Sequence, residues 1–131
     1  IEPYGKDGWG WVGEIEGGLD LDTAIQTCKQ MFDDNGYYYP LGKKEVQRVV
    51  ALSGSGAPRS DDYVWLMENK IDLFITGEPR EWNQELCRET GISFVAGGHY
   101  NSERLGVQAL GAIIQNQFDV DVQFVDVPNL A

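Results

Sequence analysis

The chain has 131 residues, of which 42% are hydrophobic and 11% are aromatic, and this composition predicts one soluble globular domain. It carries 21 acidic and 10 basic residues and a net charge of −11 at pH 7. A surface this negative repels phosphate backbones and anionic lipids, so we expect no nucleic-acid and no membrane partner. A cation is an expected ligand, and the alternative is that the charge serves only solubility or adaptation to salt.

The cysteines and the lack of long apolar runs indicate the cellular compartment of the protein. Cys28 and Cys87 lie far apart, each within a helical pattern and without a CxxC motif, so we expect them to be reduced and structural. No apolar run approaches the roughly 20 residues of a membrane span, and the sequence contains no basic-then-apolar signal peptide. We therefore expect a cytoplasmic protein. The chain starts at Ile1 without a methionine, which favours a fragment or a processed chain.

The first third of the chain predicts a strand, a helix and a short strand. Residues 9–16 alternate and are rich in Trp, Val and Ile, which is typical of a strand. Apolar residues at helical spacing predict an amphipathic helix over 22–34, and 37–40 reads as a short strand. The glycine-rich segment 1–18 is the part that we expect to be most mobile.

Short apolar strands then alternate with amphipathic helices. The predicted strands are 46–53, 72–76, 92–96 and 120–127, and the predicted helices are 59–69, 80–90 and 101–117. In the last helix one apolar stripe is expected to face the core, made of Leu105, Ala109, Leu110, Ile113 and Ile114. The pattern from about 46 to 127 is therefore βαβαβαβ, which predicts an α/β fold with a mostly parallel sheet covered by helices on both faces. The earlier strands could add antiparallel edges, and residues 1–131 would form a single domain.

Three loops each follow a predicted strand and precede a predicted helix: 53–58, 76–79 and 97–103. In a parallel sheet these loops lie at the same edge, outside the carboxyl ends of the strands, where open α/β sheets bind their ligands. The convergence of the three loops is stronger evidence for a site than any one of them.

The first loop has two interpretations. Its residues Ser53, Gly54, Ser55 and Gly56 lack the GK[ST] ending of a P-loop and the third glycine of a dinucleotide fingerprint. The glycines could serve only a tight turn, or they could expose backbone N–H groups to an anionic ligand such as a phosphate.

Two further loops carry ionisable side chains. Glu78 could be a carboxylate favoured by a helix dipole, or a carboxylate of the site that holds a ligand or acts as a general base. His99, the only histidine, lies four residues before Glu103, so on a helix both side chains face the same way, about 6 Å apart at their β-carbons. They could share one metal ion or flank two. The alternative is a hydrogen-bonded histidine near a helix start.

Four motifs in this order resemble a known family. They are "VALSGSG", "DLFITGE", "FVAGGHYNSERLGVQAL" and the ending "VQFVDVPNLA". Together they resemble the C-terminal half of the Nif-three-like (NGG-one-interacting-factor-three-like) family, which is also known as the GTP cyclohydrolase type-two homologues. The upstream "GWGWVGEI" resembles the linking strand of that family. The resemblance covers nearly the whole chain.

The resemblance implies a centre of two divalent metal ions (zinc, iron or manganese) and self-association into a ring-shaped hexamer built from trimers. The family motif G-H-x-x-[ST]-E matches Gly98, His99, Ser102 and Glu103, which makes His99 and Glu103 the implied ligands. The other family ligands, an earlier His-His pair and a later Asp, would precede Ile1. The family ending PNP is PNL here, a small departure without a clear consequence.

Three functions stay open at this stage. The first is metal-dependent hydrolysis of a nucleotide-like substrate by the intact protein, with Glu78 handling a proton and the loop 53–56 holding a phosphate. The second is a non-catalytic role in metal delivery or as a scaffold, with a small-molecule ligand. The third is an isolated domain without metal or activity. Because two ligands cannot complete a transition-metal site, we expect weak or absent metal binding by this chain alone.

Overall fold

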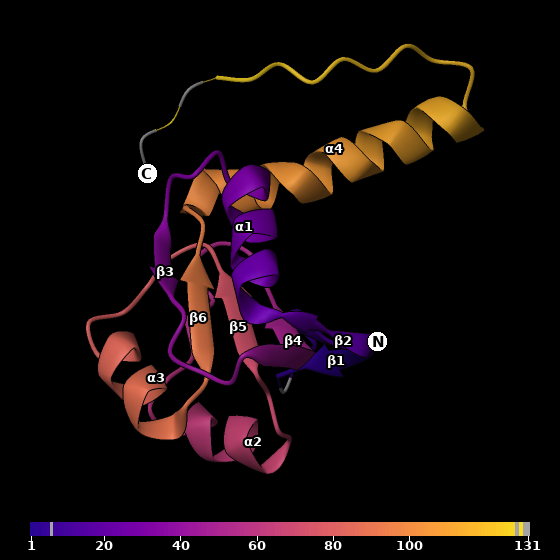
Figure 1. Cartoon of the computed structure of the whole chain (residues 1–131). Helices are drawn as coiled ribbons and strands as arrows, with labels where there is room; N and C mark the ends of the chain where they lie inside the picture. Colours follow the sequence, from indigo (N-terminus) through magenta and orange to yellow (C-terminus); the bar gives the residue numbers. More distant parts are fainter. Residues whose placement is uncertain (6, 128, 130–131) are drawn as a thin grey trace.

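The computed structural model describes residues 1–5, 7–127 and 129. Its helices and strands follow the chain in the order β1 (Glu2–Tyr4), β2 (Gly10–Asp20), α1 (Leu21–Met31), β3 (Tyr37–Tyr39), β4 (Glu45–Ala51), α2 (Asp62–Glu68), β5 (Leu73–Thr76), α3 (Asn83–Thr90), β6 (Ser93–Ala96) and α4 (His99–Gln117). The strands form one six-stranded sheet in the order β1-β2-β4-β5-β6-β3 (Figure 1).

The middle of the sheet is parallel and its flanks are antiparallel. Strand β5 pairs in parallel with both β4 and β6. On one flank β2 runs antiparallel to β4 and β1 antiparallel to β2. On the other flank β3 runs antiparallel to β6. The expected α/β fold is confirmed, and the two early strands do add antiparallel flanks to the parallel middle.

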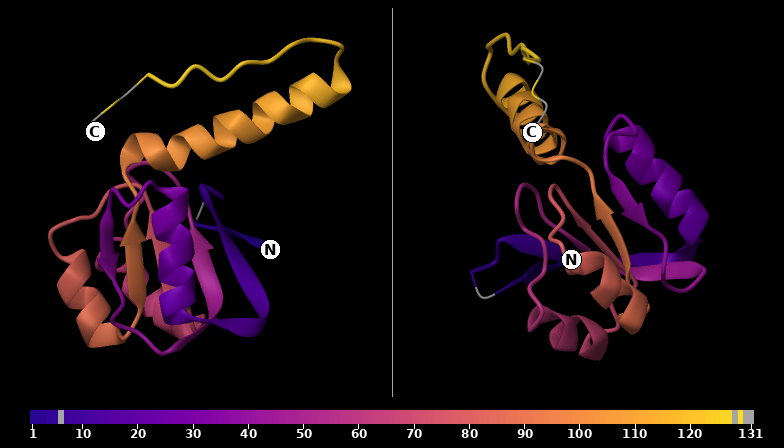
Figure 2. Two further views of the ribbon diagram at one scale, coloured as in Figure 1. Left: turned by 45° about the horizontal axis from the view of Figure 1, so that its top comes forward. Right: turned by 90° about the vertical axis from the view of Figure 1, so that its left-hand side faces the viewer.

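Helices cover both faces of the sheet (Figure 2). One face carries α1, whose apolar side chains join a buried cluster with Val46, Leu73 and Val95. The other face carries α2 and α3, and this cluster includes Phe74 and Phe94. Neighbouring residues of β5 and β6 thus belong to opposite faces, and both faces are buried, as their continuous apolar runs require.

The last helix forms as predicted, but its apolar stripe is not buried. Helix α4 spans His99–Gln117 and has no buried residue, and Leu110 and Ile113 of the expected stripe are 56% and 52% exposed. The helix begins at the edge of the sheet and then projects away from it (Figure 1). Only Leu105, at the start of the stripe, packs against the core cluster below α1. For the rest of the stripe the expectation is wrong, because periodicity predicts an apolar face and not the element that covers it.

The prediction of a final strand over 120–127 is also wrong. Residues 119–127 have no regular secondary structure and run back alongside α4 (Figure 2). Their alternation favours an extended backbone, but a strand exists only when its backbone groups pair with a neighbour. The described part of the chain supplies no such neighbour to this segment. The βα alternation of the sheet therefore ends at β6.

The glycine-rich start contributes β1 and the first part of β2 to the sheet. Lys6 lies outside the described residues. The mobility expected for 1–18 stays a prediction.

Candidate functional site

Backbone hydrogen bonds hold the three loops together at the carboxyl edge of the parallel strands. The carbonyl of Gly54 accepts from the N–H groups of Gly77 and Glu78, at 3.1 and 3.0 Å. The carbonyl of Gly77 in turn accepts from the N–H of Gly98 at 2.8 Å. The loops after β4, β5 and β6 therefore form one hydrogen-bonded layer, and the backbone fixes the positions of the side chains that they carry.

The hydroxyl of Ser102 joins this layer to α4. Its Oγ accepts from the N–H of Gly54 at 3.0 Å and donates to the carbonyl of His99 at 2.9 Å. A β-carbon at Gly77 would lie 2.5 Å from Ser102 Oγ and 2.6 Å from the Gly54 oxygen, so this close approach requires glycine. Sequence reasoning placed Ser102 only in a motif and missed this role. Its place three residues after the first residue of a helix is the signal that could have shown it.

His99 lies between two carboxylates. Its Nδ1 is 2.5 Å from Oε1 of Glu78, and its Nε2 is 3.1 Å from Oε1 of Glu103. His99 opens α4, Glu103 follows one turn later, and Glu78 reaches the ring from the loop after β5. All three side chains are partly exposed. The structure thus brings together the three ionisable residues that the sequence singled out.

The two carboxylates raise the pKa of His99 above its ordinary value of 6.5. The hydrogen bond that His99 donates to Glu78 is the largest cause, partial desolvation opposes it, and the charge of Glu103 adds to it. An imidazolium can donate to both carboxylates at once. The metal-free site therefore favours a protonated ring.

The same geometry suits a bound metal ion. Two ligand atoms that are each about 2.1 Å from a metal, at angles between octahedral and tetrahedral, lie roughly 3.0–3.4 Å apart. The 3.1 Å between His99 Nε2 and Glu103 Oε1 falls in this range. A carboxylate on the other ring nitrogen, as Glu78 provides here, commonly orients a metal-binding histidine.

The donor set is incomplete within the described residues. No group of three or more His, Cys, Asp or Glu side chains in residues 1–5, 7–127 and 129 is placed to hold a metal ion. The residues therefore fit as two ligands and one orienting carboxylate of a metal centre, and they do not close one. The ligand assignment of His99 and Glu103 stays a prediction.

The loop of Ser53, Gly54, Ser55 and Gly56 lies against this group. Gly54 has φ +62°, and a β-carbon there would lie 2.7 Å from Oε1 of Glu103. Its N–H is used by Ser102, and the nearby carboxylate repels an anion. These contacts support the turn interpretation of Gly54. The anion-binding interpretation of the loop stays a prediction and would need a cation to offset Glu103.

A second polar group surrounds the start of α4, and sequence reasoning missed it. The hydroxyl of Tyr100 donates to Asp126 at 2.5 Å, and the guanidinium of Arg104 contacts both Asp126, at 3.5 Å, and Asp33. Asp126 belongs to the segment that returns along α4. No local pattern in the sequence joins residues this distant, because the contact depends on where the segment after α4 runs.

These features define a class: an α/β protein with a polar, carboxylate-flanked histidine at the carboxyl edge of a parallel sheet. Residues 1–129 match the model of one family, described as Duf34/NIF3 (NGG1p interacting factor 3). The chain therefore belongs to the Duf34/NIF3 family. This membership confirms the resemblance of its motifs to Nif-three-like proteins.

Curated relatives and solved structures agree with this assignment. A relative from Pyrococcus abyssi, named GTP cyclohydrolase 1 type 2 homolog, is 31% identical over 98% of this chain and 51% of its own length. A relative of the same name from Escherichia coli K12 is 39% identical over 69% of this chain and 35% of its own length. The chain thus spans about a third to a half of these relatives.

Two solved structures share the fold. One is described as protein ybgI of unknown function, with a TM-score of 0.78 at 29% identity, over 94% of this chain and 49% of that one. The other is TTHA1606 from Thermus thermophilus, with a TM-score of 0.68 at 28% identity, over 87% and 44%. Within the described residues, the helices are too short or too polar to cross a membrane.

Proposed function

We propose that this chain supplies His99 and Glu103 as ligands of a divalent metal centre that another polypeptide segment completes. The observation that carries the proposal is the placement of the His99 ring, with Nδ1 held by Glu78 and Nε2 3.1 Å from Glu103 Oε1. One imidazole and one carboxylate suit zinc, iron or manganese. Two such ions would make the dinuclear centre that the family resemblance implies.

The residues around the ligands would set the geometry of the centre. Glu78 would accept a hydrogen bond from Nδ1–H of His99, and this tautomer leaves Nε2 free to bind the ion. Ser102 would hold the first turn of α4 against Gly54 through the bonds described above. The geometry favours Glu78 as the group that orients His99, whereas the general-base role would require it to leave the ring.

We further propose that the complete centre hydrolyses a nucleotide-like substrate. The support is the name of the curated relatives, GTP cyclohydrolase 1 type 2 homolog, together with the loop 53–56 beside the candidate ligands. A divalent ion at such a site supplies Lewis acidity and lowers the pKa of bound water. The alternative is a non-catalytic protein for metal delivery or a scaffold, and in either case we propose assembly as a ring-shaped hexamer built from trimers.

The metal proposal can be tested on the chain itself, because it has one histidine. Paramagnetic Mn²⁺ should broaden the imidazole NMR signals of His99 before those of distant groups. Affinity should be weaker than about 1 μM, since two ligands leave most coordination positions to water. Glu103→Gln should abolish the broadening, whereas Glu78→Gln should only weaken it, because Glu103 is a ligand and Glu78 only orients the ring of His99.

Glu85→Gln is the matched control. Glu85 pairs with Arg88 on α3 and is exposed, so its loss removes the same charge without touching the site. Equal broadening in the wild-type chain and in Glu103→Gln would contradict the ligand assignment. Zinc-, iron- or manganese-dependent release of product from GTP by a protein with a complete centre would separate hydrolysis from metal delivery.

A further inference from the structure

Asn83, the first residue of α3, is fully buried although its side chain is a polar amide. Its Nδ2 donates to the carbonyl of Pro58 at 3.1 Å and to the hydroxyl of Tyr63 at 3.2 Å. Its Oδ1 accepts from the N–H of Arg80 at 2.5 Å. Because burying an amide without partners costs free energy, these three bonds hold the side chain in one position.

The amide connects two of the three loops of the candidate site. Pro58 lies at the end of the loop after β4, and Arg80 lies in the segment that joins β5 to α3. The indole Nε1 of Trp82 also donates to the Pro58 carbonyl, at 3.4 Å. The two loops are therefore joined at two places, through the Gly54 carbonyl at the sheet edge and through the Pro58 carbonyl at the start of α3.

Glu78 lies between these two connections. Its N–H donates to the Gly54 carbonyl, and the N–H of Arg80, two residues later, donates to Asn83. Pro79 between them has a fixed φ and also restricts the backbone of the residue before it. Because the chain is held on both sides of Glu78, the direction in which this side chain leaves the backbone is restricted.

That direction matters because the contact of Glu78 with His99 is partly exposed. Oε1 of Glu78 is 2.5 Å from Nδ1 of His99, and the Glu78 side chain is 40% exposed. Exposed ion pairs are weak, in part because their side chains lose conformational freedom when they form. A backbone that is already restricted lowers this entropy cost and favours the contact.

We propose that Asn83 is a positioning residue of the candidate metal site, which holds the segment after Glu78 so that the carboxylate meets Nδ1 of His99. The inference rests on the proposed function, in which Glu78 orients His99 for an ion at Nε2. The side chain of Asn83 bonds to the two loops and to α2, so it acts on His99 only through Glu78.

The alternative is that Asn83 only stabilises the fold. It bonds to Tyr63, whose hydroxyl contacts Cys87 in the core, and the loss of any buried amide from such a network lowers stability. A lower stability therefore does not separate the two roles. They differ in the folded molecule, because only a positioning role predicts that Glu78 leaves His99 when the amide is removed.

NMR of the full chain without metal tests the proposal. The wild-type chain should show nuclear Overhauser effects between the Glu78 side chain and the ring of His99, the only histidine. Folded Asn83→Ala should lose them. Cys87→Ala is the matched control, because Cys87 is equally buried one turn later on α3 and its thiol contacts Tyr63, outside both loops. This control should lose stability and keep the Overhauser effects.

A second substitution keeps the test decisive if Asn83→Ala does not fold. Asn83→Ser retains an acceptor for the N–H of Arg80, but its side chain is too short to donate to Pro58. The Pro58 carbonyl then keeps only the bond from Trp82. The Overhauser effects should be lost in this variant as well.

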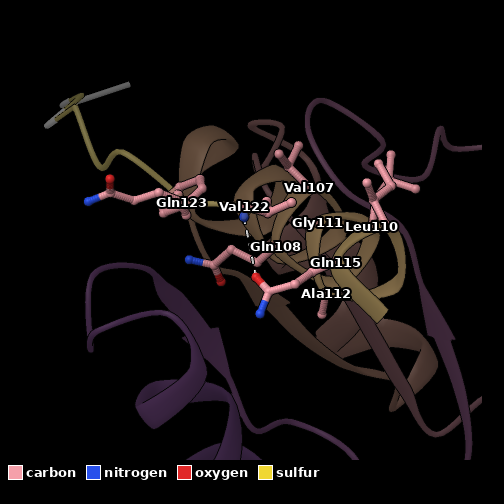
Figure 3. Close-up of a pocket in the computed structure, with 10 residues that line it drawn as sticks. Val107, Gln108, Leu110, Gly111, Ala112, Gln115, Val122 and Gln123 are labelled. Carbon is pink, nitrogen blue, oxygen red and sulfur yellow. Dashed lines mark hydrogen bonds between the residues drawn. The ribbon is translucent and has the colours of Figure 1, made fainter. Parts of the chain in front are cut away.

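Broadening of the imidazole signals by Mn²⁺ gives a second measurement. The dissociation constant for Mn²⁺ should rise about threefold to tenfold in Asn83→Ala, up to the lower end of the effect of a lost orienting partner, and it should not change in Cys87→Ala. Gln115→Ala is a further control that also removes an amide. Gln115 accepts from the N–H of Val122, beside a cavity of about 370 Å³ between α4 and residues 122–124 (Figure 3), and its loss should change neither measurement.

The results separate this proposal from the proposed function. A folded Asn83→Ala or Asn83→Ser that keeps the wild-type Overhauser effects would overturn the positioning role and leave Asn83 a structural residue. Loss of the effects in Cys87→Ala to the same extent would overturn it as well. Absence of Mn²⁺ broadening in the wild-type chain would contradict the metal site instead, and the Overhauser effects would still decide how Asn83 acts on Glu78.

Discussion

The carboxyl edge of the sheet and the arm, which is α4 together with residues 118–127, have the same kinds of sequence pattern. The two regions differ in the contacts that hold them. At the edge, the carbonyl of Gly54 alone binds two amides, from Gly77 and Glu78, and the strands beneath are buried on both faces. Along the arm, α4 has a regular helical backbone and no buried residue. The comparison shows that periodicity determines local conformation, whereas burial depends on which neighbour is present.

The two regions should differ most in how much stability is lost when a phenylalanine is replaced by alanine. Phe94 is fully buried and stacks with Phe74 and Tyr39, whereas Phe118 on the arm is 59% exposed. Phe94→Ala should lower the free energy of unfolding by about 3–5 kcal/mol, because it leaves a cavity. Phe118→Ala should lower it by less than about 0.5 kcal/mol. Chemical denaturation followed by fluorescence measures both.

A similar loss for both phenylalanines would mean that the arm is part of the folded core.

Replacing one glycine in each region by alanine should change the free energy of unfolding in opposite directions. Gly77→Ala should destabilise the chain by about 1–3 kcal/mol, since its β-carbon would lie 2.6 Å from the Gly54 oxygen. Gly106 is in α4, and a β-carbon there meets nothing within 4 Å. Gly106→Ala should therefore stabilise the chain by up to about 1 kcal/mol, through helix propensity alone. Thermal unfolding of both variants gives the two signs, and a destabilising Gly106→Ala would show that a neighbour covers this side of α4.

The electrostatics of the edge can be tested by the titration of His99. NMR of the metal-free chain should give a pKa above 6.5, and Glu78→Gln should lower it more than Glu103→Gln, because Glu78 is the larger cause. The sign for stability follows from the raised pKa. Folding is favoured by the protonated ring at pH below the unfolded pKa, and this contribution is lost as the pH rises through the folded pKa. A pKa at or below 6.5 would mean that the carboxylates do not contact the ring in solution.

The last prediction concerns the hydrogen bond that connects the segment 119–127 to the start of α4, and its expected effect on stability is small. Tyr100→Phe removes the hydrogen bond to Asp126 and should change the free energy of unfolding by less than about 1 kcal/mol, since the contact is exposed. Amide exchange in 119–127 should nevertheless become faster, because this bond holds the segment to the start of α4. Unchanged exchange would indicate that Val122 and Phe124 alone hold it.

The sequence predicted the parallel middle of the sheet well. Apolar runs such as 72–76 and 92–96 lie within a few residues of β5 and β6, because each run is bounded by glycine or by a change to polar residues. The same argument placed Glu78, His99 and Glu103 at one edge, since loops after parallel strands share an edge. The hydrogen bond between His99 and Glu78 could not be predicted, because it depends on side-chain rotamers.

The prediction failed where a neighbour was assumed. The stripe on α4 was expected to face the core and 120–127 to form a strand. In the structure only Leu105 of the stripe packs against the core cluster, and 119–127 pair with no strand in the described part of the chain. Arg104 shows the same limit in the polar residues, since its partners Asp33 and Asp126 are joined only by the path of the chain in space. Local pattern cannot supply such information.

The sheet ends on both sides in strands of three residues, β1 and β3. Strands this short offer few unpaired backbone groups, so they protect a sheet from growing into fibrous aggregates. Concentrated or heated samples of this chain should therefore not precipitate through the sheet edges while the chain remains folded. Solubility should depend on the apolar surface of α4, and polar substitutions at Leu110 and Ile113 should improve yield during expression without a cost to the fold.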